Sequence, residues 1–149
     1  MAQRNIYLAS SWRNEKQPEI VATLRKAGHE VYDFRNPLPG DDGFHWSKVD
    51  PDWQTWTAPE FIRGLAHQAS DAGYALDFNA MKWADTFVLL LPCGKSAHLE
   101  LGWAAGQGKE TYILLDADPE PELMYKMVNH LCADLGDLLR KLDFDSREK

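Results

Sequence analysis

Residues with the chemistry of a ligand site follow the apolar run at 86–92, in the stretch PCGKSAHLELGWAAGQGKE at residues 92–110. Gly94-Lys95-Ser96 matches the end of a phosphate-binding loop, and Glu100 lies four residues further on. A loop of the type Gly-x-x-x-x-Gly-Lys-Ser needs a glycine where this chain has Leu89, so the backbone nest that wraps a triphosphate is missing. The stretch instead predicts a short turn before a helix N-terminus, whose free N–H groups can bind one anionic group.

Glu100 is the strongest candidate for chemistry in this stretch. If the helix begins between Gly94 and Ser96, the carboxylate lies about one turn into it, and its neighbours at helical spacing are Ala97, Trp103 and Ala104. Such neighbours favour a site that faces inward. The helix dipole also stabilises a carboxylate near a helix N-terminus, by about 0.3–1 kcal/mol. The pattern alone therefore leaves a purely structural role open beside a catalytic one.

Two further residues raise the same question. Asp77 lies beside an apolar stripe formed by Tyr74, Phe78 and Met81, where a solvated aspartate is not the expected choice. Tyr7 lies within an apolar strand-like run. Each is also compatible with an ordinary structural role, as a helix-surface acid and as a core tyrosine.

Cysteine and histidine chemistry finds less support in the sequence. Cys93 and His98 could form a thiolate–imidazole pair at a helix N-terminus, but no orienting third residue follows at a recognisable spacing. His45, His67 and His130 are scattered and lack the paired spacing of a zinc site. We therefore expect neither a nucleophilic cysteine nor a metal site.

Alternating strand and helix patterns must position these residues. The apolar runs predict strands at 5–10, 29–34, 86–92 and 110–116, with a short fifth at 128–133, and amphipathic spacing predicts helices at 15–28, 70–85, 96–109 and 135–144. Strands that alternate with helices imply a parallel sheet with right-handed crossovers. The sequence thus predicts an α/β fold, a single three-layer flavodoxin-like or Rossmann-like domain over 1–149 with about five mainly parallel strands.

In such sheets, ligands bind outside the carboxyl ends of the strands. Three of these ends can be located here, at Ser10-Ser11-Trp12-Arg13, Phe34-Arg35-Asn36 and Pro92-Cys93-Gly94. We expect the site to be built from these segments and from Glu100 behind the third of them.

The segment at 35–60 breaks the alternation. It is rich in proline, glycine and tryptophan and has no clear periodicity. Trp46, Trp53 and Trp56 argue against disorder, because so much aromatic area favours burial. Two interpretations stay open, a loop pinned onto the core and a lid or pocket wall that stacks on a flat ligand.

Length, charge and cysteine content limit the class of protein. The 149 residues suffice for a buried core, and the net charge of −7 disfavours binding to polymeric nucleic acid. Two cysteines are too few for a disulfide framework. With no apolar signal region and no run of the roughly 20 residues that span a bilayer, we expect a cytoplasmic protein without a membrane partner.

Several of these signals coincide in an ordered set of motifs. The segments IYLASSW, DFNAMKWADTFVLLL and HLELGWAAGQGKETYILL together resemble the nucleoside 2-deoxyribosyltransferase family, which includes the 2'-deoxynucleoside 5'-phosphate N-hydrolases. The similarity covers roughly residues 4–33 and 74–127. The ordered set is fairly specific, whereas each motif alone is weak.

The resemblance assigns roles to residues of this chain. Glu100 matches the family's nucleophilic glutamate, Tyr7 the tyrosine that orients it, and Asp77 the acid beside the sugar or base. In the hydrolase branch, Ser11 and Arg13 fall on positions that help to hold a 5'-phosphate. These roles require the side chains of Tyr7, Asp77 and Glu100 to converge at one end of the sheet. Trp12 or the segment at 46–56 could then stack on the base.

This chain departs from the family pattern at two places. The transferases carry an aspartate, and the nucleotide hydrolases a serine, where this chain has Gly94; Ser96 and His98 are nearby substitutes. The transferases also carry an asparagine before Leu-Met in a segment that completes a neighbouring subunit's site. Glu122 replaces it here, before Leu123 and Met124. A carboxylate there could accept from a sugar hydroxyl and would repel a phosphate.

The resemblance implies cleavage or exchange of the N-glycosidic bond of a 2'-deoxynucleoside or its 5'-monophosphate through a covalent glycosyl-glutamate, with no cofactor and in a homo-oligomer. Whether water or a second base completes the reaction stays open. Two alternatives also stay open, an N-glycosidase that acts on a dinucleotide such as NAD, and a nucleotide-binding module without catalysis.

Overall fold

The computed structural model of the chain describes residues 3–116 and 120–148. The chain divides into two compact units, one formed by Met1–Asp33 together with Trp83–Lys149 and the other by Phe34–Lys82. The first unit contains the whole sheet. The expectation of one domain over 1–149 stays a prediction.

The sheet has five strands, and all of its neighbouring strands are parallel. The strands are β1 (Asn5–Ala9), β2 (Glu30–Tyr32), β3 (Thr86–Leu90), β4 (Glu110–Leu114) and β5 (His130–Cys132). Their order, β2-β1-β3-β4-β5, is that of the flavodoxin-like folds. The predicted α/β class is confirmed, and the order of the strands reverses between β1 and β3.

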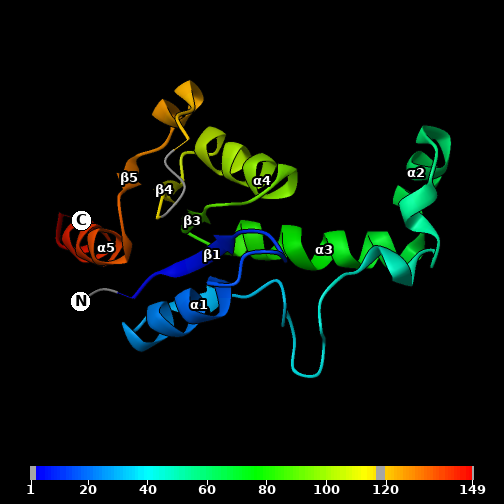
Figure 1. Cartoon of the computed structure of the whole chain (residues 1–149). Coiled ribbons are helices and arrows are strands. Elements are labelled where there is room, and N and C mark those ends of the chain that lie inside the picture. Colours follow the sequence, from blue (N-terminus) through cyan, green and yellow to red (C-terminus); the bar gives the residue numbers. More distant parts are fainter. Residues whose placement is uncertain (1–2, 117–119, 149) are drawn as a thin grey trace. The chain divides into compact units, whose positions relative to one another are not determined.

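Helices cover both faces of this sheet (Figure 1). Helices α1 (Gln17–Lys26) and α5 (Leu135–Glu148) lie on one face, and α4 (Lys95–Gly106) lies on the other. Between the sheet and the first pair lies a core of aliphatic side chains, among them Ile6, Leu8, Val88 and Leu138. Because side chains alternate along a strand, Tyr7 and Phe87 point to the α4 face.

Glycine residues explain where two of the helices end. Gly28 after α1 and Gly108 after α4 have φ values of 102° and 76°. Such left-handed backbone favours glycine, since other residues are strained there. Both helix ends were expected from the sequence, and α4 begins at Lys95, within the predicted window.

The second unit consists of two short 3₁₀ turns, η1 (Trp46–Lys48) and η2 (Trp53–Thr55), helix α2 (Ala58–Leu65) and most of α3 (Gln68–Trp83). Trp46 contacts the rings of Phe44, Trp56 and Phe61 edge to face. The Trp56 ring also lies so close to Gly64 that a Cβ there would come within 2.5 Å of it. The tryptophan-rich segment is therefore ordered by its own aromatic cluster and by α2.

Three details of this unit differ from expectation. Helix α2 was not predicted. Helix α3 begins at Gln68 rather than at a cap formed by Ser70 or Asp71, and the Ser70 hydroxyl instead donates to the carbonyl of Gly64 at 2.7 Å. The apolar stripe is only partly a core stripe: Met81 is buried, but Tyr74 is 66% exposed and stacks on Phe78 one turn away.

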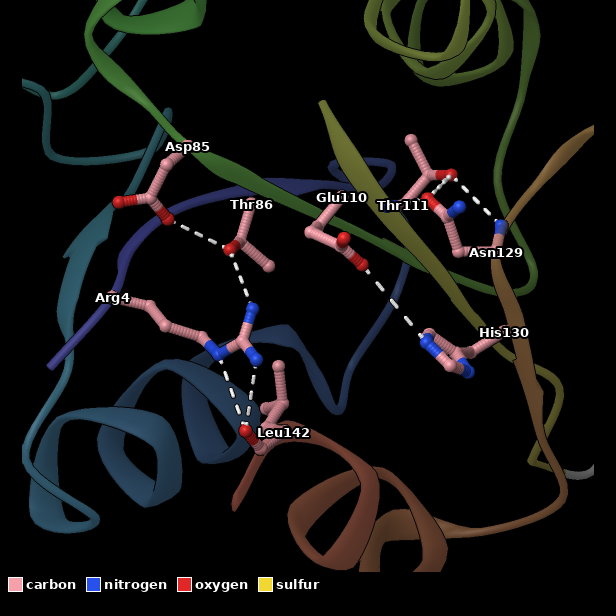
Figure 2. Close-up of polar contacts among 8 residues, drawn as sticks. All are labelled: Arg4, Asp85, Thr86, Glu110, Thr111, Asn129, His130 and Leu142. Atoms are coloured by element: carbon pink, nitrogen blue, oxygen red, sulfur yellow. Dashed lines mark hydrogen bonds and ion pairs between the residues drawn. The ribbon is translucent and has the colours of Figure 1, made fainter. Parts of the chain in front are cut away.

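Polar residues at the amino end of the sheet hold the first unit together (Figure 2). The buried guanidinium of Arg4 donates through Nε and Nη2 to the carbonyl of Leu142 in α5, at 3.2 and 3.0 Å. Its Nη1 donates to the Thr86 hydroxyl at 3.1 Å, and that hydroxyl donates to Asp85 at 2.7 Å. Arg4 thereby links the starts of β1 and β3 to the last helix.

His29 is buried in the same region. Its Nδ1 accepts a hydrogen bond from the backbone N–H of Arg4 at 3.1 Å. Burial lowers the pKa of His29, and the Arg4 charge lowers it further, while Asp85 and Asp143 act in the opposite direction. The folded chain therefore favours neutral imidazole at this position.

None of the helices within the described residues is both long enough and apolar enough to cross a bilayer.

We predict that Arg4→Met lowers the free energy of unfolding by about 2–4 kcal/mol, because it removes charge-assisted hydrogen bonds and leaves buried acceptors unsatisfied. Chemical denaturation measures this. The control is Arg140→Met on the exposed surface of α5, where Arg140 pairs with Asp137; a change of about 0.5 kcal/mol or less is expected. Equal stability of the two variants would refute the role of Arg4.

We further predict a pH dependence from His29. Its pKa is lowered in the folded state, so the unfolded chain binds the proton more readily. Stability should therefore fall as the pH drops through about 6.5, the ordinary histidine value, toward the lower folded value. Denaturation curves between pH 7.5 and 5.5 should show a smaller fall for His29→Asn than for the wild type. An equal fall in the free energy of unfolding of the two proteins over this pH range would contradict this account.

Candidate active site

The clearest polar contact at the carboxyl end of the sheet joins Tyr7 and Glu100. The hydroxyl of Tyr7 donates to Oε2 of Glu100 at 2.6 Å. Tyr7 is 1% exposed, whereas Glu100 is half-buried. A carboxylate that accepts a short hydrogen bond while still reaching solvent is both ordered and accessible to a ligand.

The topology explains why these two residues meet. Tyr7 lies on β1, opposite Phe87 of β3 in the register, and Glu100 is the sixth residue of α4, the helix that follows β3. Strands β1 and β3 flank the point where the strand order reverses. Open α/β sheets form their ligand crevices outside the carboxyl ends of the strands at such a point.

The contact also favours a negative charge on the carboxylate. A hydrogen bond donated to a carboxylate favours its ionised form. An ionised, oriented carboxylate can act as a nucleophile or as a general base.

The loop after β1 is tied to the loop after β3. The Ser10 hydroxyl donates to the Leu90 carbonyl at 3.0 Å, and the Asn14 side-chain amide donates to the Pro92 carbonyl at 3.2 Å. Asn14 is buried, and its Oδ1 accepts from the backbone N–H of Lys16 at 2.9 Å. These bonds hold two of the three predicted site segments together.

Within the β1 loop, Ser11 accepts a hydrogen bond from the backbone N–H of Arg13 at 3.1 Å. Trp12 is 43% exposed, and Arg13 is exposed as well. Lys16 is paired with Asp116 after β4 at 2.5 Å. This pairing raises the pKa of Lys16. A planar apolar group and a cation are thus presented to solvent at this end of the sheet.

The turn before α4 confirms that no phosphate-binding loop is present. Leu89, where such a loop needs glycine, is fully buried within β3. Gly94 is the N-cap of α4, and a Cβ added there would meet no atom within 4 Å. Packing therefore does not require a glycine at this position. Ser96 is exposed in the first turn of the helix.

His98 is held by its surroundings. Its Nδ1 lies 2.8 Å from the carbonyl of Gly94 and 3.7 Å from Sγ of Cys93, and its Nε2 lies 2.8 Å from the Tyr125 hydroxyl. Because a carbonyl only accepts, Nδ1 carries the proton. The nitrogen nearest to Cys93 is therefore a donor and not a base for the thiol.

Glu122 and Met124 belong to the short 3₁₀ turn η3 (Leu123–Met127) and to its N-cap. Oε1 of Glu122 accepts from the backbone N–H of Met124 at 3.1 Å. Both residues line a hollow of about 490 Å³ beside α4, to which His98 and Tyr125 also contribute. Residues 98, 101, 102 and 105 of α4 face this hollow. Glu100 is about half a helical turn away from them, on the face toward Tyr7.

Asp77 lies half-buried on α3, in the second unit. Its convergence with Tyr7 and Glu100 stays a prediction. Of the three predicted catalytic side chains, Tyr7 and Glu100 are in direct contact.

Two residues escaped the sequence analysis. Asn14 joins the β1 and β3 loops, and Tyr125 holds His98 against η3. The signal for Asn14 was present, because a polar residue shortly after a buried strand and before a helix is a common loop anchor. Nothing in the sequence spacing pairs Tyr125 with His98.

No three His, Cys, Asp or Glu residues gather in a way that could hold a metal ion, as far as residues 3–116 and 120–148 are concerned.

Comparison with solved structures tests the fold. The CMP N-glycosidase BcmB of Clostridium botulinum matches 96% of this chain and 98% of its own, with a TM-score of 0.53 and 20% identity. A 2-deoxyribosyltransferase of Bacillus psychrosaccharolyticus matches 93% of this chain and 90% of its own, with a TM-score of 0.56 and 20% identity. A conserved protein of Enterococcus faecalis V583 matches 97% and 99%, with a TM-score of 0.61 and 15% identity.

The chain has the fold of these three proteins. The resemblance drawn from the sequence motifs is thereby confirmed at the level of the fold, since one of the three is named as a 2-deoxyribosyltransferase. No family model matches the sequence, and no curated protein matches it either.

Proposed function

We propose that the protein cleaves or exchanges the N-glycosidic bond of a 2'-deoxynucleoside or its 5'-monophosphate, with Glu100 as the nucleophile. The observation that carries this proposal is the 2.6 Å hydrogen bond from Tyr7 to Glu100 beside the strand-order reversal. The family resemblance of the motifs around both residues supports it. Two solved structures of the same fold, named as an N-glycosidase and a deoxyribosyltransferase, support it further.

The proposed reaction has two steps. In the first, the Glu100 carboxylate attacks C1' of the sugar, the N-glycosidic bond breaks, and its electron pair leaves with the base. By the resemblance, Asp77 would supply the proton that the departing base takes up. In the second, water or another base attacks C1' and displaces Glu100 as a carboxylate, and the proton that the attacking group loses returns to Asp77. A carboxylate suits this role because the oxocarbenium-like centre at C1' attracts and can be trapped by an anion.

The substrate is proposed to lie over the two linked loops. By the resemblance, Arg13 and the hydroxyl of Ser11 would bind a 5'-phosphate and Trp12 would stack on the base; the side chains of Trp12 and Arg13 are exposed. The Glu122 carboxylate is held by the backbone of Met124. Glu122 thus caps its own turn, and its charge favours a sugar hydroxyl over a phosphate as its partner.

We also propose that the chain assembles with itself. Four large apolar side chains on α4 and η3 are more than half exposed: Leu99, Leu123, Met124 and Met127. Met124 and Met127 line the hollow beside α4, and exposed apolar side chains that gather in one region commonly mark a protein interface. By the resemblance, the segment that contains Glu122 and Met124 would complete the site of a neighbouring copy.

The proposed location is the cytoplasm. Two cysteines are too few for a disulfide framework, which suits a reducing compartment.

To test the activity, the protein is incubated with deoxynucleosides, their 5'-monophosphates, CMP and NAD. The free base that is released from each is then measured by chromatography. We expect release from at least one deoxynucleoside or deoxynucleotide. Glu100→Gln should lower kcat by about a thousandfold or more, since it removes the nucleophile. Tyr7→Phe should lower it by about ten- to a hundredfold, because the carboxylate loses its orienting donor. A Glu100→Gln protein that releases base at the wild-type rate would overturn the proposal, and release from NAD alone would favour the dinucleotide alternative.

The assembly is tested by light scattering coupled to size-exclusion chromatography. We expect the wild-type protein to have a mass at least twice that of one chain. Leu99→Lys combined with Met127→Lys should reduce this mass to that of one chain, because the two charges would be buried in an apolar interface. Phe144→Lys is the matched control, since Phe144 is an equally exposed apolar residue on α5. A wild-type protein that stays monomeric, or a double variant of unchanged mass, would contradict the assembly.

A further inference from the structure

A row of aromatic rings crosses the sheet at the position of Tyr7. The Tyr7 ring is stacked between Tyr32 of β2 and Phe87 of β3, with centroid distances of 5.4 and 5.0 Å and interplanar angles of 17° and 23°. The three residues are direct partners in the strand register, so their side chains share one face of the sheet. Tyr7 therefore has a ring against each side of its own.

The row continues into the helix that carries Glu100. The ring of Trp103 lies 6.2 Å from that of Phe87, tilted by 52°. Trp103 follows Glu100 by three positions in α4, so the two side chains lie near each other on the helix surface. Lys109 closes the row with its ammonium 5.8 Å from the centre of the Trp103 ring.

On the opposite face of the same three strands, the side chains that fill the core are aliphatic and include no aromatic ring. The neighbouring positions there are aliphatic: Ile6 and Leu8 on β1, Val31 on β2, and Val88 on β3. Both faces are buried. Within β1, β2 and β3 the aromatic side chains thus lie on the face on which Tyr7 meets Glu100, whereas Tyr112 of β4 belongs to the core on the other face.

Stacking on both sides restricts how the Tyr7 ring can move. Rotation about χ1 would drive the ring into Tyr32 or Phe87, so the hydroxyl is held in one direction. A displacement of about 1 Å at a reacting group can cost on the order of a hundredfold in rate. The donor that orients the Glu100 carboxylate is therefore itself fixed by its neighbours.

We infer that Phe87 and Trp103 are positioning residues: Phe87 fixes the Tyr7 ring, and Trp103 braces Phe87 from the helix that carries Glu100. The inference rests on the proposed function only for its kinetic effect, because the geometry concerns the Tyr7–Glu100 contact itself. Neither Phe87 nor Trp103 is required to touch the substrate.

The kinetic test uses Phe87→Leu, which keeps an apolar side chain but removes the ring. We expect kcat to fall about ten- to a hundredfold, KM to change little, and the acidic limb of the pH–rate profile to move to higher pH because the carboxylate loses part of its stabilising hydrogen bond. In a Tyr7→Phe background, Phe87→Leu should lower kcat no further. Val88→Ala, on the same strand but the opposite face, should lower the melting temperature and leave kcat and the pH profile unchanged.

The inference fails if folded Phe87→Leu keeps the wild-type kcat and pH profile. It also fails if Phe87→Leu lowers kcat by the same factor in the Tyr7→Phe background as in the wild type. Trp103→Leu, at a half-buried position, provides the same test if Phe87→Leu does not fold. A crystal structure of either variant separates this inference from the proposed function. We expect the Tyr7–Glu100 separation to exceed hydrogen-bond distance, and an unchanged 2.6 Å contact would refute the inference even in a protein without measurable activity.

Discussion

A single hydrogen bond, from a buried phenol to a half-buried carboxylate, links the fold of this protein to its chemistry. Tyr7 and Glu100 are 93 positions apart in the chain, and their contact requires β1 beside β3 and α4 on the correct face of the sheet. Any shift of register by one residue would turn Tyr7 to the opposite face. The parallel order of the strands is therefore a condition for the site, and the site depends on the packing that maintains this order.

The two ends of the sheet serve different purposes. At the amino end, Arg4, Thr86 and the carbonyl of Leu142 satisfy one another inside the protein, and Thr111 pairs with Asn129 in the same way (Figure 2). At the carboxyl end, the loops are joined to each other by Ser10 and Asn14, while Trp12 and Arg13 face solvent. Buried polar groups are costly unless they are paired, so the closed end stabilises the sheet and the open end is available for a ligand.

The sequence predicted those parts of the fold in which local signals and tertiary packing agree. The strands, the start of α4 at Lys95 and the glycine after α1 were all expected, because apolar runs and Gly28 leave few alternatives. Helix α2 was not predicted although Thr57 and Glu60 form a capping box, because the tryptophan-rich segment before it is typical of a loop. The exposure of Tyr74 could not be foreseen, because helical periodicity identifies a face and does not show what covers it. The contact between Tyr7 and Glu100 was predicted from the family resemblance, because no spacing in the chain implies it.

Trapping the glycosyl-enzyme tests the central claim most directly. A 2'-deoxy-2'-fluoro substrate analogue slows both steps, because the fluorine destabilises the cationic centre at C1'. With a base that departs readily, the first step stays faster than the second, and the ester accumulates. Intact-protein mass spectrometry after incubation should show the mass of one fluorinated sugar, and peptide mapping should place it on Glu100. Turnover of the analogue without any adduct, or an adduct on another residue, would contradict the account.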